Sequence, residues 1–178
     1  MLISEKDIHL FPIEEFITSI QIKDRINKLA KCIESDHQSQ KLIALIVLKG
    51  SICFAADLLR EIDLDVQIEF IHLSSYKDDV STDIEMKSIS SNNFSGERII
   101  IIEDIVDTGK TVNYISEYLA PFNPKSIQVC CLLNKKSRRQ IPIQIDYNGF
   151  DIEDLFVVGY GMDFNNRFRN LPFIGILS

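Results

Sequence analysis

The chain lacks several features that would assign it to large classes of protein. In its 178 residues, no apolar run approaches the roughly 20 residues that a membrane-spanning helix needs. Its first residues include early acids and no long apolar stretch, so we expect no signal peptide. No internal repeat or low-complexity tract is visible. These absences predict a soluble, cytoplasmic protein with no membrane partner.

Positive charge is also scarce. The chain has 19 Lys and Arg residues against 26 Asp and Glu residues, and its formal net charge is -7. A protein that binds duplex nucleic acid presents a basic face, so we expect no nucleic-acid partner. An acidic protein binds an anionic ligand through local groups such as backbone amides, a few Lys or Arg residues, or a metal ion.

The cysteines show no C-x-x-C spacing and lie among apolar residues. Zinc sites and redox disulfides ordinarily use such a spacing. We therefore expect reduced thiols that pack as small hydrophobic side chains in a reducing compartment. The residues concerned are Cys32, Cys53, Cys130 and Cys131.

Hydrophobic patterning predicts strands that alternate with helices. Residues 13–33 carry apolar side chains at helical spacing, whereas residues 42–48 (LIALIVL) form a continuous run typical of a strand buried on both faces. The polar, unpatterned residues 74–83 predict a mobile loop. Further strands are expected at 66–73, 85–89, 98–102, 127–133, 155–158 and 173–177, and further helices at 53–62 and 110–119.

This alternation is typical of βαβ units. We predict an α/β fold in a single domain of residues 1–178, with a central, mostly parallel sheet flanked by helices. In such sheets, ligands bind beyond the carboxyl ends of the strands. The positions after Leu48, Ile102, Leu133 and Val158 are therefore the places to look for a site.

The segment IIIEDIVDTGKT, residues 100–111, runs from a strand through two acids into a turn and a helix. Gly109 permits unusual backbone angles, and the amides at the helix start point outward with the positive end of the helix dipole. A phosphate could be held there mainly by backbone groups. Glu103 and Asp104 could hold vicinal hydroxyls or a hydrated metal ion. Both reach one ligand only if the strand has ended, because neighbouring strand residues point to opposite faces.

Other interpretations fit this segment less well. A Walker A loop needs a glycine five residues before its Gly-Lys-Thr, and position 104 is Asp. The triplet at 107–109 also occurs in aspartic proteases, but those proteins are all-β. A capped helix after a core strand explains the threonines and leaves the acids unexplained.

Strand, paired acids, two apolar residues and Asp-Thr-Gly-Lys-Thr together resemble the phosphoribosyl-pyrophosphate loop of type I phosphoribosyltransferases. The resemblance extends from about Ile43 to the end of the chain. It implies that the ribose hydroxyls lie near Glu103 and Asp104, and that Asp107 is the general base. It also implies that the 5-phosphate of the sugar donor binds the loop residues Asp107, Thr108, Gly109, Lys110 and Thr111.

Two further segments resemble parts of the same family. Lys49 and Gly50 match its pyrophosphate loop, which implies a strained or cis peptide between Leu48 and Lys49. Ser75 and Tyr76 match a Ser-Tyr pair on a loop that closes over the reacting centre.

Lys135 matches the family lysine that donates a hydrogen bond to the purine 6-oxo group. Such a donor selects 6-oxo over 6-amino purines. Its basic neighbours Lys136, Arg138 and Arg139 are expected to form a solvated face.

The segment FVVGYGMDFNNRFRNLPFIGIL, residues 156–177, resembles the C-terminal signature of the hypoxanthine (hypoxanthine-guanine) branch of the family, particularly its bacterial members. The resemblance implies that Phe156 stacks on the base and that the Val157 backbone reads its Watson–Crick edge. It further implies that Asp163 ligates magnesium and that Arg169 contacts pyrophosphate.

The implied reaction is transfer of the 5-phosphoribosyl group from phosphoribosyl pyrophosphate to N9 of hypoxanthine or guanine, giving IMP or GMP and pyrophosphate. The implied cofactor is Mg²⁺, held by Glu103, Asp104 and Asp163. The family also suggests a core of about residues 35–160, a small hood built from the N-terminal segment and about residues 145–178, and a homodimer or homotetramer.

Two alternatives stay open at this point. A regulator could use the fold to sense the sugar pyrophosphate while binding nucleic acid, although the acidic charge opposes this. A transferase for xanthine or a pyrimidine is opposed by Lys135 and by the C-terminal signature.

Overall fold

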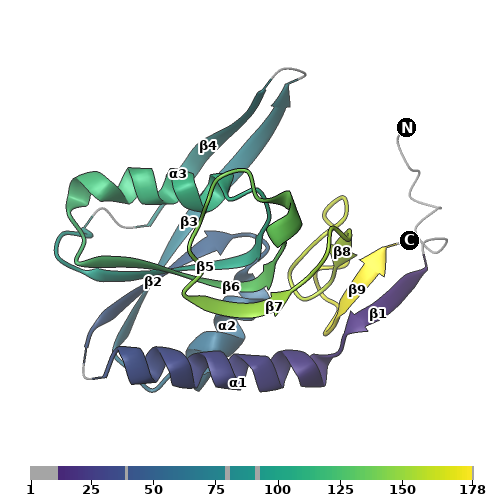
Figure 1. The fold of residues 1–178 in the computed structure, drawn as a ribbon, viewed down its shortest axis with the longest axis horizontal. Helices are drawn as coiled ribbons and strands as arrows, with labels where there is room; N and C mark the ends of the chain where they lie inside the picture. The colour runs from purple at the N-terminus through teal and green to yellow at the C-terminus, as the bar shows by residue number, and fades with distance from the viewer. Residues whose placement is uncertain (1–11, 39, 79–80, 91–92, 178) are drawn as a thin grey trace.

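The main layer of the molecule is a six-stranded sheet (Figure 1). The computed structural model describes residues 12–38, 40–78, 81–90 and 93–177. Neighbouring strands run parallel except for β3 and β4, which are antiparallel, so the predicted α/β fold is confirmed. In the order β4-β3-β2-β5-β6-β7, the strands are Ser81–Ile89, Val66–Asp78, Leu42–Leu48, Arg98–Val106, Ser126–Asn134 and Tyr147–Asp151.

Helices cover both faces of this sheet. Helices α1 (Ser19–Asp36) and α2 (Ile52–Glu61) pack on one face, and α3 (Lys110–Leu119) packs on the other. Strand β2 is buried on both faces, because alternate residues along it enter two separate apolar clusters, as its continuous apolar sequence predicts. In the described ranges, no helix is both long enough and apolar enough to cross a membrane.

The N-terminal helix begins later than predicted. Residues Ile13–Ile17 form strand β1, and Thr18 then caps α1. The Thr18 hydroxyl accepts from the Gln21 amide at 3.2 Å, and the Gln21 side-chain oxygen accepts from the Thr18 amide at 2.9 Å. This reciprocal capping box ends the strand and starts the helix, a signal that the apolar spacing alone does not carry.

Strand β1 joins the two ends of the described chain. It pairs antiparallel with β9 (Ile174–Leu177), which also pairs with β8 (Val157–Val158), in a small sheet of order β1-β9-β8. This sheet lies beside the main one in Figure 1.

The stretch predicted as a mobile loop, residues 74–83, lies mostly in an antiparallel hairpin. The backbone of β3 continues to Asp78, β4 starts at Ser81, and the two strands pair from Asp78↔Ser81 to Ile71↔Ile89. The loop prediction is wrong because backbone pairing at a sheet edge does not require apolar side chains. The side chains of Ser75 and Tyr76 lie outside the described part of the structure.

Candidate active site

A cleft of about 510 Å³ opens at the carboxyl ends of the parallel strands. Its walls come from the segments that follow β2 and β6, from the C-terminal parts of β3 and β5, and from residues 156–169, which are far apart in the sequence. The rule for parallel sheets predicts this location. The predicted site residues that line it are Lys49, Gly50, Asp104, Lys135, Phe156, Val157, Asp163 and Arg169.

The loop after β2 fits tightly against its neighbours. The Leu48–Lys49 peptide is cis, as the family resemblance implies. A Cβ atom on Gly50 would lie 2.0 Å from Oδ2 of Asp104, and a Cβ on Gly161 would lie 2.0 Å from the Gly50 carbonyl oxygen. At position 161, glycine is needed for the two backbones to approach so closely, because the neighbouring atom belongs to the main chain.

The paired acids do not share one face of the sheet. Strand β5 runs on to Val106, so the condition under which Glu103 and Asp104 would both reach one ligand directly is not met. Asp104 lines the cleft, whereas Glu103 is buried on the other side, and its Oε2 atom has no hydrogen-bond partner among the described residues. An orphaned buried carboxylate oxygen is rare and points to a missing donor or cation.

Burial governs the protonation of both acids. It raises the pKa of Glu103 well above its usual value, and the neighbouring charge of Asp104 adds to the effect. Burial also raises the pKa of Asp104 to about 6, although two backbone amides and Arg169 favour its ionised form. A cation bound beside these acids would stabilise their ionised forms.

At the far end of the cleft, Asp163 and Arg169 form a closed local unit. Arg169 pairs with Asp163 at 2.6 Å and donates to the Gly161 carbonyl at 2.6 Å. The second Asp163 oxygen accepts from the Asn166 amide at 2.7 Å. The segment thus presents a carboxylate and a guanidinium to the cleft side by side.

The loop of residues 107–111 is held in place by contacts with residues outside the loop. Gly109 has φ +87°, and a Cβ there would lie 2.6 Å from the Ile141 carbonyl oxygen. The Thr108 carbonyl accepts from the Gln140 and Ile141 amides, each at 3.0 Å. In the part of the chain that the structure describes, no backbone carbonyl accepts from the amides of Thr108, Gly109 and Thr111. These N–H groups start helix α3 and can bind an anion.

The basic residues after β6 are partly misassigned by the sequence. Lys136, which pairs with Asp151 at 2.6 Å, and Arg138 are exposed as predicted, but the prediction of a solvated face is wrong for Arg139, which is partly buried. The 3-10 turn Lys136–Arg138 folds the chain back toward the end of β5, which brings both arginines to the loop.

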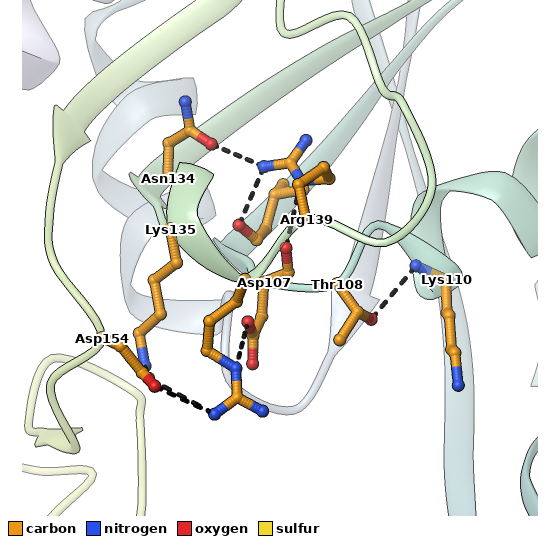
Figure 2. Close-up of polar contacts among 9 residues, drawn as sticks. Asp107, Thr108, Lys110, Asn134, Lys135, Arg139 and Asp154 are labelled. Atoms are coloured by element: carbon orange, nitrogen blue, oxygen red, sulfur yellow. Dashed lines mark hydrogen bonds and ion pairs between the residues drawn. The ribbon is translucent and has the colours of Figure 1, made fainter.

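Figure 2 shows what Arg139 does there. Its guanidinium donates to the carbonyl oxygens of Val106 and Asp107 at 3.1 and 3.0 Å, and to the Asn134 side chain at 2.6 Å. These hydrogen bonds of Arg139 were not predicted, because the sequence of a basic run does not indicate which of its side chains points into the protein.

Lys135 is buried although it is charged. Its ammonium group lies 3.9 Å from Asp154 and lines the cleft. Phe156, by contrast, is 54% exposed for so large a side chain, with its ring edge-to-face against Phe164. A buried donor and an exposed aromatic ring in one cleft suit a planar ligand with polar edges.

His72, Leu73 and Ser74 also line the cleft and were not predicted. His72, the register partner of Leu48, is the last residue of β3 that pairs with β2, and Leu73 and Ser74 follow it. Their position at the carboxyl end of a parallel strand was the available signal.

Among the described residues, no three His, Cys, Asp or Glu side chains gather into a metal site of their own. The predicted set of Glu103, Asp104 and Asp163 therefore does not form a self-contained cage. Asp104 and Asp163 do line the same cleft. Two carboxylates fit Mg²⁺, which is ordinarily bound by one or two carboxylates together with water and substrate phosphates.

Comparison with known proteins assigns the family. The phosphoribosyl transferase domain matches residues 14–165. The chain belongs to this family. It is 39% identical over 164 residues to the hypoxanthine-guanine phosphoribosyltransferase of Bacillus subtilis, with 91% of each chain covered. It is 36% identical over 167 residues to the hypoxanthine phosphoribosyltransferase of Escherichia coli strain K12, with 92% of this chain and 94% of the relative covered.

A solved phosphoribosyltransferase has the same fold. The crystal structure of a hypoxanthine-guanine phosphoribosyltransferase from Bacillus anthracis superposes with a TM-score of 0.88 at 38% identity, covering 93% of this chain and 98% of that one. The family resemblance inferred from the motifs is therefore confirmed.

Proposed function

We propose that this phosphoribosyltransferase transfers the 5-phosphoribosyl group of phosphoribosyl pyrophosphate to N9 of hypoxanthine, and also of guanine, in purine salvage. IMP or GMP and pyrophosphate are the products. The observation that carries the proposal is the convergence of the predicted residues from four segments on one cleft.

The sugar phosphate binds the loop of residues 107–111. The amides of Thr108, Gly109 and Thr111, from which no backbone carbonyl of the described residues accepts, support this assignment, because they can neutralise a phosphate through backbone groups in an acidic protein. Asp104, on the cleft side of β5, is in reach of the ribose hydroxyls.

Pyrophosphate binds between Lys49, Gly50 and Arg169. Asp104 and Asp163 are the cleft carboxylates that would hold Mg²⁺, whereas Glu103 lies on the other side of the sheet. When bound, Mg²⁺ would offset the negative charge that develops on the leaving pyrophosphate.

The purine lies between Phe156 and Lys135. The exposed ring of Phe156 stacks on the base, and the backbone of Val157 reads its edge. Lys135 donates to the 6-oxo group. Adenine would place a second donor against this ammonium group and leave it unpaired, so adenine is disfavoured.

The chemical step joins N9 to C1 of the ribose while the bond from C1 to the pyrophosphate oxygen breaks. Pyrophosphate leaves with the electron pair of that bond. The proton on N7 of the purine moves to the Asp107 carboxylate, which acts as the general base. Closure of the β3–β4 hairpin, carrying Ser75 and Tyr76, is the proposed means of excluding water.

The remaining parts of the proposal concern the whole molecule. We assign the β1-β9-β8 sheet to the hood of the single domain. The free state of the four cysteines agrees with a reducing, cytoplasmic compartment. Assembly into a homodimer or homotetramer follows the family.

The test is a parallel assay of hypoxanthine, guanine, xanthine and adenine with phosphoribosyl pyrophosphate, with and without Mg²⁺. We expect turnover of hypoxanthine and guanine in the presence of Mg²⁺, and at least about 10²-fold lower kcat/KM for adenine. Preferred use of adenine or xanthine, or no turnover of any base, would contradict the proposal.

A further inference from the structure

Arg138 lies between two residues that the proposed function uses at the base. Its Nε atom is 3.1 Å from Oδ1 of Asp107. Its Nη1 atom is 3.2 Å from one oxygen of Asp154 and 3.4 Å from the other. Asp154 is in turn 3.9 Å from the ammonium group of Lys135. A chain of ion pairs therefore joins Asp107 to Lys135, with Arg138 and Asp154 between them.

The two ends of this chain serve neighbouring atoms of the purine. Asp107 is assigned to the N7 proton and Lys135 to the 6-oxo group, and both atoms lie on the same edge of the base. A group that fixes the spacing of Asp107 and Lys135 therefore determines how these two side chains contact that edge of the base. Small errors in such positioning slow a reaction strongly, because the reacting atoms must be aligned.

The adjacent arginines divide the support of Asp107. Arg139 donates to the Asp107 backbone carbonyl and so holds the main chain. Arg138 contacts only the carboxylate. Oδ1 of that carboxylate is buried and has no hydrogen-bond partner among the described residues, so its contact with Arg138 is an ion pair. The Asp107 side chain as a whole is 38% exposed, so Arg138 contacts the buried oxygen and leaves another part of the side chain accessible.

We propose that Arg138, anchored by Asp154, is a positioning residue that orients the Asp107 carboxylate toward N7 of the bound purine. The inference rests on the proposed function, because it needs Asp107 as the general base. Arg138 and Asp154 are 46% and 53% exposed, and exposed ion pairs add little to folding. Variants at these positions are therefore expected to fold, and the substitutions should change the catalytic rate rather than stability.

The test measures kcat and both KM values for Arg138→Gln, Arg138→Lys and Asp154→Asn. Arg138→Gln lowers kcat about 10-fold and leaves the KM for phosphoribosyl pyrophosphate within about twofold of the wild-type value. Arg138→Lys recovers part of the loss, because a cation remains near Asp107. Asp154→Asn lowers kcat in the same direction by less. The matched control is Lys136→Gln, which removes a neighbouring exposed cation that pairs with Asp151 instead.

A double-mutant cycle with Asp107→Asn separates a positioning role from a general structural one. If Arg138 acts through Asp107, adding Arg138→Gln to Asp107→Asn costs nothing further in kcat. The same 10-fold loss in both backgrounds, an equal loss in Lys136→Gln, or wild-type kcat in Arg138→Gln overturns the inference and leaves the proposed function intact. A wild-type protein with no turnover of hypoxanthine or guanine overturns both.

Discussion

Two loops that the proposed function assigns to the same ligand are built in opposite ways. The loop of residues 107–111 is held by partners about 30 positions further along the chain, chiefly Arg139 and the Gln140 and Ile141 amides. The segment of residues 159–169 is held mainly by local bonds, Asp163 to Asn166 and Arg169 to Gly161, although the Tyr160 hydroxyl also donates to the distant Asp57. The first depends on the assembled sheet, whereas the second is largely a local fold. Substitutions in the two loops should therefore fail differently.

The largest expected effect is a loss of catalytic rate on substitution of Asp107, in the loop of residues 107–111. Asp107→Asn keeps the shape of the side chain and removes its basicity, so kcat falls about 10²–10⁴-fold with a modest change in KM. Steady-state kinetics at saturating sugar donor measure it. Asp63→Asn, an exposed acid outside the cleft, is the matched control and keeps full activity. Full turnover by Asp107→Asn would remove Asp107 as the base.

Glycine substitutions test how tightly each loop is packed. Gly161→Ala places a Cβ 2.0 Å from the Gly50 carbonyl oxygen at φ +100°, and Gly109→Ala places one 2.6 Å from the Ile141 carbonyl oxygen at φ +87°. Each should lower the free energy of unfolding by about 3 kcal/mol or more.

The control is Gly96→Ala, which has φ +71° but no atom within 4 Å of the added Cβ. It carries only the backbone strain, about 1 kcal/mol. Urea unfolding of the three variants measures the difference. Equal losses at all three glycines would show that close approach contributes nothing.

Substitutions of Arg139 and Arg169 should differ in their effect on the free energy of unfolding. Arg139→Gln removes donors to the Val106 and Asp107 carbonyls, so we expect a loss of about 2 kcal/mol in unfolding free energy and a KM for phosphoribosyl pyrophosphate raised about 10-fold. Arg169→Gln raises the same KM but changes stability by less than about 1 kcal/mol, because its partners are local and partly exposed. Similar stability losses in both variants would erase the distinction between the loops.

The last expected effect depends on pH. Burial raises the pKa of Asp104 to about 6, so between pH 4 and 6 the folded state holds a proton that the unfolded state has released. The free energy of unfolding therefore falls as pH rises through this window. Asp104→Asn removes that penalty and should be more stable than wild type by about 3 kcal/mol at pH 8, with no gain at pH 4. Thermal melts of the wild type and of Asp104→Asn at pH 4 and pH 8 measure this difference in stability. A stability gain that is the same at both pH values would contradict the raised pKa of Asp104.

Sequence reasoning found these two loops because each carries a motif of unusual residue types. The acids and glycine near Gly109, and the closing segment from Phe156 to Arg169, need no knowledge of partners to be noticed. The strands around them were found because their apolar runs are long.

The features that could not be predicted from the sequence are long-range. The inward turn of Arg139, the continuation of β5 past Asp104 and the pairing of β1 with β9 all depend on contacts between distant segments. Strand β7 (Tyr147–Asp151) was missed for the same reason, since it is a short edge strand defined by pairing with β6. Local propensity and periodicity carry no record of such pairing.

The most direct test is a crystal structure of the protein with phosphoribosyl pyrophosphate and Mg²⁺. We predict the 5-phosphate at about 3 Å from the amide nitrogens of Thr108, Gly109 and Thr111. A sugar phosphate bound elsewhere in the cleft, with these amides bonded to protein atoms, would contradict the account.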